Sequence, residues 1–319
     1  MSAKGLGSRA IIGRFYATLA AVAPGWVDLI GFKVDSDQES ETYKWLGQIP
    51  GLREFVGGRQ AKGFTENGIT VENIEFEATL EVFVKELERD KTGQIMVRVN
   101  EMARRAGTHW ATLVSTLINN GAASVCYDGQ YFFDTDHKEG KNVTNQSNLL
   151  TVDISELAVT NHGTISAPSV GEAREAITQA IAAQLAFKDN ENEPMNEDAR
   201  SFVVMAPTNG IWTACRAAVG LPMVDSGEAN VLVAMQNMDG YNVSVVMNPR
   251  LTFTDSFCVF RTDAFVKPFI LQEEVPLEMS AIAEGSELEF KEKKHWYGAY
   301  TRRNAAYGMW SQATKVVMI

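Results

Sequence analysis

Histidine and carboxylate side chains gather in one short stretch of this sequence, Asp134-Thr-Asp136-His137. Asp128 precedes the stretch and Glu139 follows it. Carboxylate oxygens together with an imidazole nitrogen suit a divalent metal such as Mn²⁺, Mg²⁺ or Zn²⁺. A metal held by Asp134, Asp136 and His137 could activate a water molecule, so the stretch defines a candidate metal-dependent hydrolase site.

A polar turn is the alternative role for these residues. They follow residues 131–133 (Tyr-Phe-Phe), which are typical of a short strand, and Asp side chains often accept hydrogen bonds from backbone N–H groups in turns. No HExxH, EF-hand or facial-triad spacing accompanies them. We therefore expect Asp134, Asp136 and His137 to be structural and to hold no metal.

Other catalytic signatures are absent from the sequence. It contains no GxSxG, P-loop or GxGxxG motif. Its three cysteines (Cys126, Cys215 and Cys258) form no CxxC pair, and the apolar neighbours of Cys126 and Cys258 are typical of inert, buried thiols. An odd number of cysteines favours a reducing compartment over a disulfide framework. The sequence predicts no catalytic residue, no metal and no cofactor.

The composition is that of a folded globular protein. The chain has 319 residues, of which 45% are hydrophobic and 22% are charged, and its formal net charge is −11. This length suits two domains or one large one. A protein that binds nucleic acid or an anionic membrane across a whole face carries the opposite charge, so the composition excludes that class.

The N-terminal stretch allows two interpretations. The apolar run 15–23 follows basic residues, as in a signal peptide. Ile11, Phe15 and Leu19 also share one helical stripe, which is typical of an amphipathic helix. Because Pro24 directly follows the candidate cleavage site, we favour an amphipathic arm helix. No other stretch approaches the ~20 apolar residues of a membrane span, so we expect a soluble chain.

The first half of the chain predicts a long hairpin and a long helix. Residues 65–68 (Thr-Glu-Asn-Gly) contain the turn dipeptide Asn-Gly, and residues 69–84 then alternate between apolar and charged side chains. A strand so long and so charged on one face is expected to project from the subunit. Residues 94–120 follow the 3.6-residue period and end at Gly121, which predicts a helix about 40 Å long.

The second half predicts a capped helix and a series of strands. Ser169 and Glu172 have the spacing of a capping box, which begins a helix over 169–187. The predicted class is α+β, with mostly antiparallel pairing in the last third. The predicted strands are 201–206, 241–247, 256–261, 268–272 and 295–317.

Several segments resemble one known family. They are YKWLGQIP (43–50), LREFVG (52–57), FEATL (76–80), CYDGQYFFD (126–134) and YGAYTRRNAAYGMW (297–310). In this order, they are similar to segments of the Mu-like phage major head subunit gpT, a major capsid protein with the Hong Kong 97-type fold. The resemblance spans residues 43 to 310, and the first 40 residues match the family poorly.

The resemblance implies a division of the chain into the parts of that fold. The spine helix is then residues 94–120, inside the peripheral domain. The implied parts are an N-terminal arm (1–56), an extended E-loop hairpin (57–92), the peripheral domain with the spine helix (93–187), an axial domain (188–263) and the return strands of the peripheral domain (264–319).

The resemblance also implies a structural function without enzymatic activity. Such a subunit self-assembles as hexamers and pentamers into an icosahedral shell around double-stranded phage DNA, which it contacts non-specifically. The implied partners are copies of itself, a portal protein, a scaffold and decoration proteins, with no membrane. The implied location is the virion, after assembly in the host bacterial cytoplasm.

Candidate contacts between subunits lie in the hairpin and in the last predicted strand. In the hairpin they are Lys62, Phe64, Glu66 and Asn67. In the strand they are Arg302 and Arg303, whose side chains must point to opposite faces because they are adjacent. We expect one arginine to be buried with a carboxylate or carbonyl partner and the other to face a neighbouring subunit.

Two alternatives to a phage shell stay open at this point. An encapsulin-like bacterial compartment would use the same fold to enclose a cargo enzyme. A metal-dependent hydrolase would use Asp134, Asp136 and His137. Assembly into shells separates the hydrolase from both shell proteins, and neighbouring genes separate the two kinds of shell.

Overall fold

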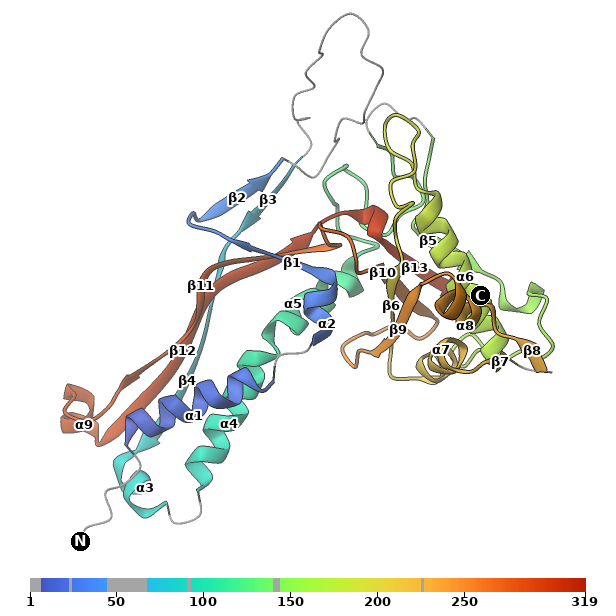
Figure 1. Cartoon of the computed structure of the whole chain (residues 1–319). Helices are drawn as coiled ribbons and strands as arrows, with labels where there is room; N and C mark the ends of the chain where they lie inside the picture. Colours follow the sequence, from blue (N-terminus) through green and yellow to red (C-terminus); the bar gives the residue numbers. More distant parts are fainter. Residues whose placement is uncertain (1–6, 23–24, 45–67, 91–92, 140–143, 225–226) are drawn as a thin grey trace, which may run out of the picture.

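The computed structural model of the chain describes residues 7–22, 25–44, 68–90, 93–139, 144–224 and 227–319. An elongated arm is built on a four-stranded sheet, and a rounder body is built on a five-stranded sheet (Figure 1). Helices and strands are mixed within both parts, as expected for the predicted α+β class.

A long hairpin gives the arm its length. Its two strands, β11 and β12, have 14 residues each, so each spans about 45 Å. Helix α9 (Glu287–Glu292) joins them at the far end of the arm (Figure 1). Across the sheet the order is β1 (Gly31–Asp35), β11 (Phe269–Ile282), β12 (Lys294–Tyr307) and β4 (Ile74–Phe83). Only the outer pair of β1 with β11 is parallel.

Helices cover one face of this sheet. The predicted N-terminal helix is confirmed as α1 (Ser8–Ala20), and it buries Ile11 and Phe15 completely. It packs against α4 (Gln94–Gly107), and their apolar residues share a core with Tyr297 of β12. The remaining helices of this half are α2 (Gly25–Ile30), α3 (Val84–Arg89) and α5 (His109–Asn120).

The predicted single helix over 94–120 is wrong in one respect, because it is broken at Thr108. Helix α4 ends at Gly107 and α5 begins at His109. A Cβ atom on Gly107 would lie 3.4 Å from Leu19 Cδ1 and 3.5 Å from Val22 Cβ. These are ordinary van der Waals distances, so a Cβ atom would fit there, and Gly107 favours the break through its low helix propensity.

The predicted strand over 69–84 is two strands. Strand β3 (Ile69–Glu72) pairs with β2 (Ser40–Tyr43), and β4 pairs with β12 along ten residues. Asn73 separates them, and its amide donates to Ser36 Oγ and Gln38 O. The prediction that this whole strand projects from the subunit is wrong for β4, because its partner lies in the same chain.

The body sheet has the order β5-β13-β10-β6-β9. One of its faces packs on α6 (Val170–Ala186) and α7 (Gly210–Gly220), and the other shares a core with α5 and the strands β11 and β12 of the arm. Helix α6 begins at the predicted capping box, which is confirmed. The Ser169 hydroxyl accepts from the backbone N–H of Glu172, and the Glu172 carboxylate accepts from the backbone N–H of Ser169. None of the described helices is both long and apolar enough to cross a bilayer. The strands are β5 (Leu149–Val152), β6 (Ser201–Ala206), β9 (Asn242–Met247), β10 (Ser256–Arg261) and β13 (Ala313–Met318), with short strands β7 (Met223–Val224) and β8 (Glu228–Ala229). The helices are η1 (Ile154–Glu156), α6 (Val170–Ala186), α7 (Gly210–Gly220) and α8 (Val231–Met238).

The predicted final strand over 295–317 is also two strands, and they belong to different sheets. Strand β12 ends in the arm at Tyr307, a short helix η3 (Trp310–Gln312) follows, and β13 lies in the body. A Cβ atom on Gly308 would lie 2.5 Å from Lys267 O, so only glycine fits where the chain crosses over. The C-terminal segment thus ties the two parts of the molecule together.

Candidate functional site

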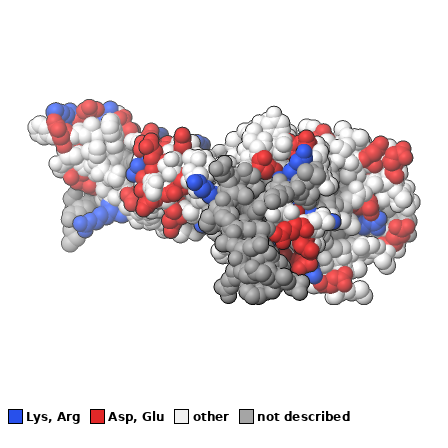
Figure 2. Space-filling view, turned by 90° about the horizontal axis from the view of Figure 1, so that it is seen from above, with Lys and Arg blue, Asp and Glu red and all other residues white. Residues whose placement is uncertain are grey.

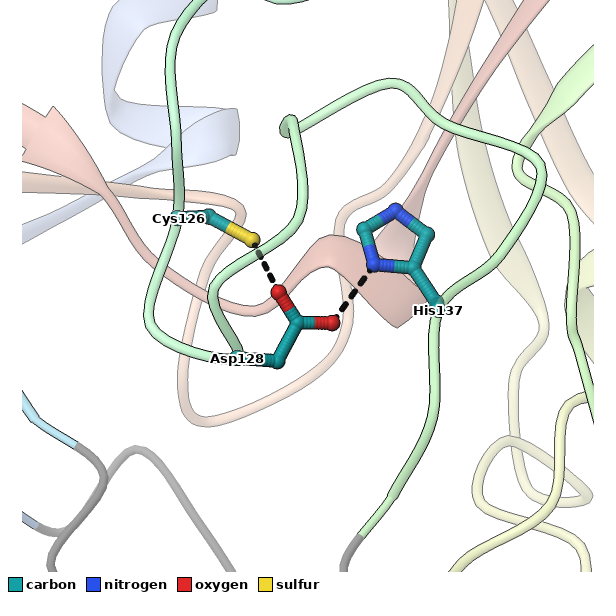
Figure 3. A group of neighbouring side chains, drawn as sticks. All are labelled: Cys126, Asp128 and His137. Carbon is teal, nitrogen blue, oxygen red and sulfur yellow. Dashed lines mark hydrogen bonds and ion pairs between the residues drawn. The ribbon is translucent and has the colours of Figure 1, made fainter. Parts of the chain in front are cut away.

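A buried polar cluster lies in the loop that follows α5. His137 Nδ1 is 2.7 Å from Asp128 Oδ2, and Cys126 Sγ donates to Asp128 Oδ1 over 2.9 Å (Figure 3). The side chains of His137 and Asp128 are 0% and 4% exposed. Asp128 lies between the other two residues, so its carboxylate joins the cysteine to the histidine.

Residues from three segments surround His137. Asn148, just before β5, faces the ring through its Oδ1, 3.2 Å from Nε2. Trp310 of η3 stacks on the imidazole, with the ring centroids 4.1 Å apart and the planes 4° from parallel. Glu139 accepts hydrogen bonds from Tyr127 Oη (2.6 Å) and Trp310 Nε1 (3.1 Å). The cluster therefore fastens the loop to the C-terminal segment.

The predicted grouping of Asp134, Asp136 and His137 is not what the structure brings together. Asp134 accepts from the backbone N–H groups of Tyr131 and Thr135, and Asp136 is exposed and accepts from the Thr135 hydroxyl. These are the turn contacts expected from the structural interpretation. His137 instead joins Asp128 and Cys126, and the cysteine was missed because C-x-D-x8-H matches no recognised ligand spacing.

Cys126, Asp128 and His137 have donor atoms within 4.8 Å of one another, a group that could hold a metal ion. The distances between these atoms fit hydrogen bonds better than metal coordination. Separations of 2.7 and 2.9 Å are hydrogen-bond distances. Burial, followed by the nearby charge of Asp128, raises the pKa of Cys126 far above its usual value, so the sulfur stays a thiol and a poor ligand.

The two arginines of β12 point to opposite faces of the arm sheet, as predicted. The Arg303 side chain is 5% exposed, lies 3.5 Å from Glu273 Oε1, and stacks over the Trp110 ring at 4.7 Å. The expectation of one buried arginine with a carboxylate partner is therefore confirmed. The Arg302 side chain is 37% exposed and forms an ion pair with Glu274 of its own chain at 3.0 Å. Its contact with a neighbouring subunit stays a prediction.

The hairpin candidates Lys62, Phe64, Glu66 and Asn67 lie outside the described residues. Their proposed role as contacts between subunits stays a prediction.

The arm sheet leaves one face open, and that face is acidic. Glu75, Glu77 and Glu81 of β4 are exposed on the side away from the helices. Beside them, Trp296 of β12 is 40% exposed and donates through Nε1 to Glu81. Acidic side chains are spread over both ends of the molecule in the view of Figure 2, in keeping with the net charge of −11.

An apolar hollow of about 610 Å³ lies between α4 and β4. Phe76 and Leu80 line it from the strand, and Met102 lines it from the helix. His109 also borders it, but burial and then the charge of Arg303 lower the pKa of His109 to about 4. The ring is therefore neutral near pH 7, and its Nδ1 is occupied as the acceptor of the Arg303 Nε–H.

The part of the body around β7 and α8 exposes apolar side chains. Met223 is 63% exposed and Met238 is 84% exposed, and Leu221 and Val231 are about half exposed. Residues 207–249 include only four charged residues, Arg216, Asp225, Glu228 and Asp239. Depletion of charge with enrichment of methionine is the composition of the centre of a protein–protein interface.

Two curated relatives are about one third identical to this chain over the stretches that match. The Mu-like prophage FluMu major head subunit of Haemophilus influenzae is 37% identical over 142 residues, which are 44% of this chain and 46% of the relative. The major capsid protein of Escherichia phage Mu is 34% identical over 137 residues, which are 41% of this chain and 45% of the relative. The matched stretch thus spans less than half the length of each relative.

Solved structures give the fold. The procapsid of bacteriophage JBD30 matches with a TM-score of 0.54 and 23% sequence identity, over 97% of this chain and 74% of the capsid chain. The arm sheet with its long helices, joined to the body sheet, is therefore the architecture of a phage capsid protein, the Hong Kong 97-type fold.

The family follows from the sequence match. The family described as Mu-like prophage major head subunit gpT matches residues 8–161 and 228–317, which are more than half of the chain. Its named relatives are structural head and capsid proteins, not enzymes. The chain belongs to the Mu-like prophage major head subunit gpT family.

Proposed function

We propose that this chain is the major capsid protein of a Mu-like phage. Copies of it assemble as hexamers and pentamers into an icosahedral shell that encloses double-stranded DNA. Membership of the gpT family is the observation that carries the proposal. The subunit would then be a component of the virion, assembled in the bacterial cytoplasm, with a portal, a scaffold and decoration proteins as partners.

The surfaces of the isolated chain support assembly with other copies. Both the body and the arm expose large apolar side chains. Met238 of α8, in the body, is 84% exposed, and Phe290 of α9, at the far end of the arm, is 82% exposed. Large exposed apolar groups mark protein–protein contact sites. Contacts in both parts of the molecule suit a subunit that must touch several neighbours at once.

We assign the parts of the fold as the resemblance implied. The rounder body contains the axial domain, 188–263, whose exposed apolar side chains around Met223 and Met238 we place toward the axis of a hexamer or pentamer. The peripheral domain, 93–187 and 264–319, contains the helices α4 and α5 and the strands β11 and β12 of the arm sheet. The E-loop, 57–92, contributes β4 to that sheet, and we propose that its part before β3 contacts a neighbouring subunit.

The negative charge of the subunit suits a container for DNA. A strongly basic lining would hold the genome and resist its packaging and release. With a net charge of −11, the chain is expected to contact DNA weakly and without sequence preference.

Electron microscopy tests the proposal. The full chain is expressed alone and together with candidate scaffold and portal proteins from the same gene cluster, and the products are examined in negative stain. The proposal predicts closed shells of uniform size in at least one combination. A chain that stays monomeric in every combination would contradict it, and shells that enclose one protein cargo and no DNA would favour an encapsulin-like compartment.

A further inference from the structure

We infer that His137 is an imidazolium in the folded chain. Its ion pair with Asp128 requires that proton and stabilises the contact between the loop 121–139 and the C-terminal segment. The inference concerns the subunit itself and does not depend on the proposed function. It rests on which atoms face the two nitrogens of the ring.

Asn148 determines the protonation state of Nε2 of His137. Its amide nitrogen donates to Phe132 O (2.8 Å) and Trp310 O (3.2 Å), and its Oδ1 accepts from the backbone N–H of Asp134 (2.9 Å). These three contacts fix the orientation of the amide, because a flipped amide would place two donors or two acceptors face to face at each contact. Oδ1 therefore faces His137 Nε2, and that nitrogen must carry a hydrogen.

Asp128 determines the protonation state of Nδ1 of His137. A neutral ring with hydrogen on Nε2 would point the lone pair of Nδ1 at Asp128 Oδ2 over 2.7 Å, which is repulsive when the carboxyl is ionised. A proton must therefore lie between the two atoms. The contact is short, as charge-assisted hydrogen bonds are.

The surroundings place this proton on the ring. The other oxygen of Asp128 already accepts from the Cys126 thiol and from the backbone N–H of Gln130 (3.1 Å), and both bonds favour the ionised carboxylate. Burial alone would raise the pKa of Asp128, but these hydrogen bonds and the contact with His137 hold it below its usual range. Trp310 offers the imidazole its face, a position that suits a cation.

The other titratable groups around the ring are on the same loop. Burial raises the pKa values of Cys126, Tyr127 and Glu139, so the thiol and the phenol stay neutral near pH 7. No Lys or Arg side chain has a hydrogen bond or ion pair to Asp128, His137 or Glu139 among the contacts of the described residues. The charge that balances Asp128 is therefore the imidazolium.

The contact depends on the proton between the two atoms. Without that proton, the lone pair of Nδ1 would face the Asp128 carboxylate. Protonation of Asp128 at low pH sets an O–H against the N–H of the ring. Both changes weaken the link from the loop to Trp310, which lies between the arm strand β12 and the body strand β13.

Nitrogen NMR of the full-length, unassembled subunit labelled with ¹⁵N-histidine reads the protonation state directly. The chain has only four histidines, and the variants H109N, H162N and H295N assign the remaining signal to His137. We expect both ring nitrogens of His137 to show shifts of protonated nitrogens at pH 7. A single protonated nitrogen, with the other at the shift of an unprotonated one, would overturn the inference.

The variant D128N tests the partner, with D136N as the matched control on the same loop. An asparagine amide can donate to Nδ1, so in D128N the ring becomes neutral and one nitrogen signal moves to the unprotonated range. D136N leaves both signals unchanged, because Asp136 is exposed. If D128N keeps both nitrogens protonated, Asp128 is not the counter-ion. Stoichiometric metal in the purified wild-type subunit, lost in D128N, would also contradict the inferred ion pair and would indicate a metal site.

Discussion

Arg303 donates a hydrogen bond through Nε to Nδ1 of His109, over 3.1 Å. The pair joins the last strand of the arm sheet to the first residue of α5, next to the break in the long helix at Thr108. The same guanidinium reaches toward Glu273 and covers the Trp110 ring. One buried cation thus holds the helix layer to the sheet.

Substitution of Arg303 should strongly destabilise the subunit. Removal of one partner from a buried charged contact typically costs about 3–5 kcal/mol, and we expect Arg303→Ala to lower the free energy of unfolding by about that amount. Arg303→Lys keeps the charge but loses the Nε donor and the planar stack, so its loss should be smaller. Urea unfolding of the unassembled subunit measures both, and an alanine variant that unfolds at the same urea concentration as the parent would contradict this account.

Arg302 should behave in the opposite way. Its side chain is 37% exposed, and its ion pair with Glu274 is partly solvated, so Arg302→Ala should change the free energy of unfolding by no more than about 0.5 kcal/mol. If Arg302 contacts a neighbouring subunit, the same variant loses assembly, which sedimentation of the particles measures. A variant that assembles as well as the parent would show that Arg302 is simply a surface residue.

His109 should make the stability depend on pH in the acid range. Burial and then the charge of Arg303 lower its pKa to about 4 in the folded chain, against about 6.5 when unfolded. The unfolded chain therefore binds the proton first as the pH falls. The contribution of neutral His109 to the free energy of unfolding is complete above about pH 6.5 and is lost as the pH falls toward about 4, by up to about 1.4 kcal/mol per pH unit.

The variant His109→Asn isolates that contribution, because its Oδ1 can still accept from Arg303 and does not titrate. The parent should lose stability relative to the variant as the pH falls between these limits. A constant difference in the free energy of unfolding from pH 7 to pH 4 would show that the ring does not titrate as described.

A charge at Met238, at the end of α8, should prevent assembly without unfolding the subunit. Met238 is 84% exposed in the isolated chain, so Met238→Glu should leave the melting temperature nearly unchanged. Burial of that carboxylate against a second copy would be costly, so shells should be absent or rare. Met238→Leu keeps an apolar side chain of similar volume and should assemble normally. Normal shells from the glutamate variant would place Met238 outside any contact between subunits.

Removal of residues 60–67 tests the E-loop and leaves β3, which begins at Ile69, intact. We expect a folded subunit that melts cooperatively but forms no shells, because the deleted segment is proposed to lie on a neighbour. Phe64→Ser is a milder variant that should weaken assembly in the same direction. Shells of normal yield and size from the deletion would refute the proposed contact.

Local patterns predicted the parts of the fold that depend on neighbouring residues. The apolar stripe of Ile11 and Phe15 identified α1, and the spacing of Ser169 and Glu172 identified the start of α6, because both signals are complete within one or two helical turns. The opposite orientations of Arg302 and Arg303 followed from the two-residue period of a strand.

The features that sequence reasoning missed depend on contacts between distant segments. The division of the last predicted strand at Gly308 depends on the close approach of the Lys267 backbone. The candidate site at His137 was centred on the wrong carboxylates, because Asp134 and Asp136 lie within three residues of His137 in the sequence. Asp128, noted only as a flanking residue, and Cys126 reach the ring once the loop folds back.

Cryo-electron microscopy of the particles formed when this chain is produced with its scaffold tests whether the chain builds a phage shell. We expect a closed icosahedral shell whose hexamers and pentamers consist of this chain, with residues 188–263 around the axes of those hexamers and pentamers. Particles whose shell is built from a different protein, or a chain that never enters a closed shell, would contradict this expectation.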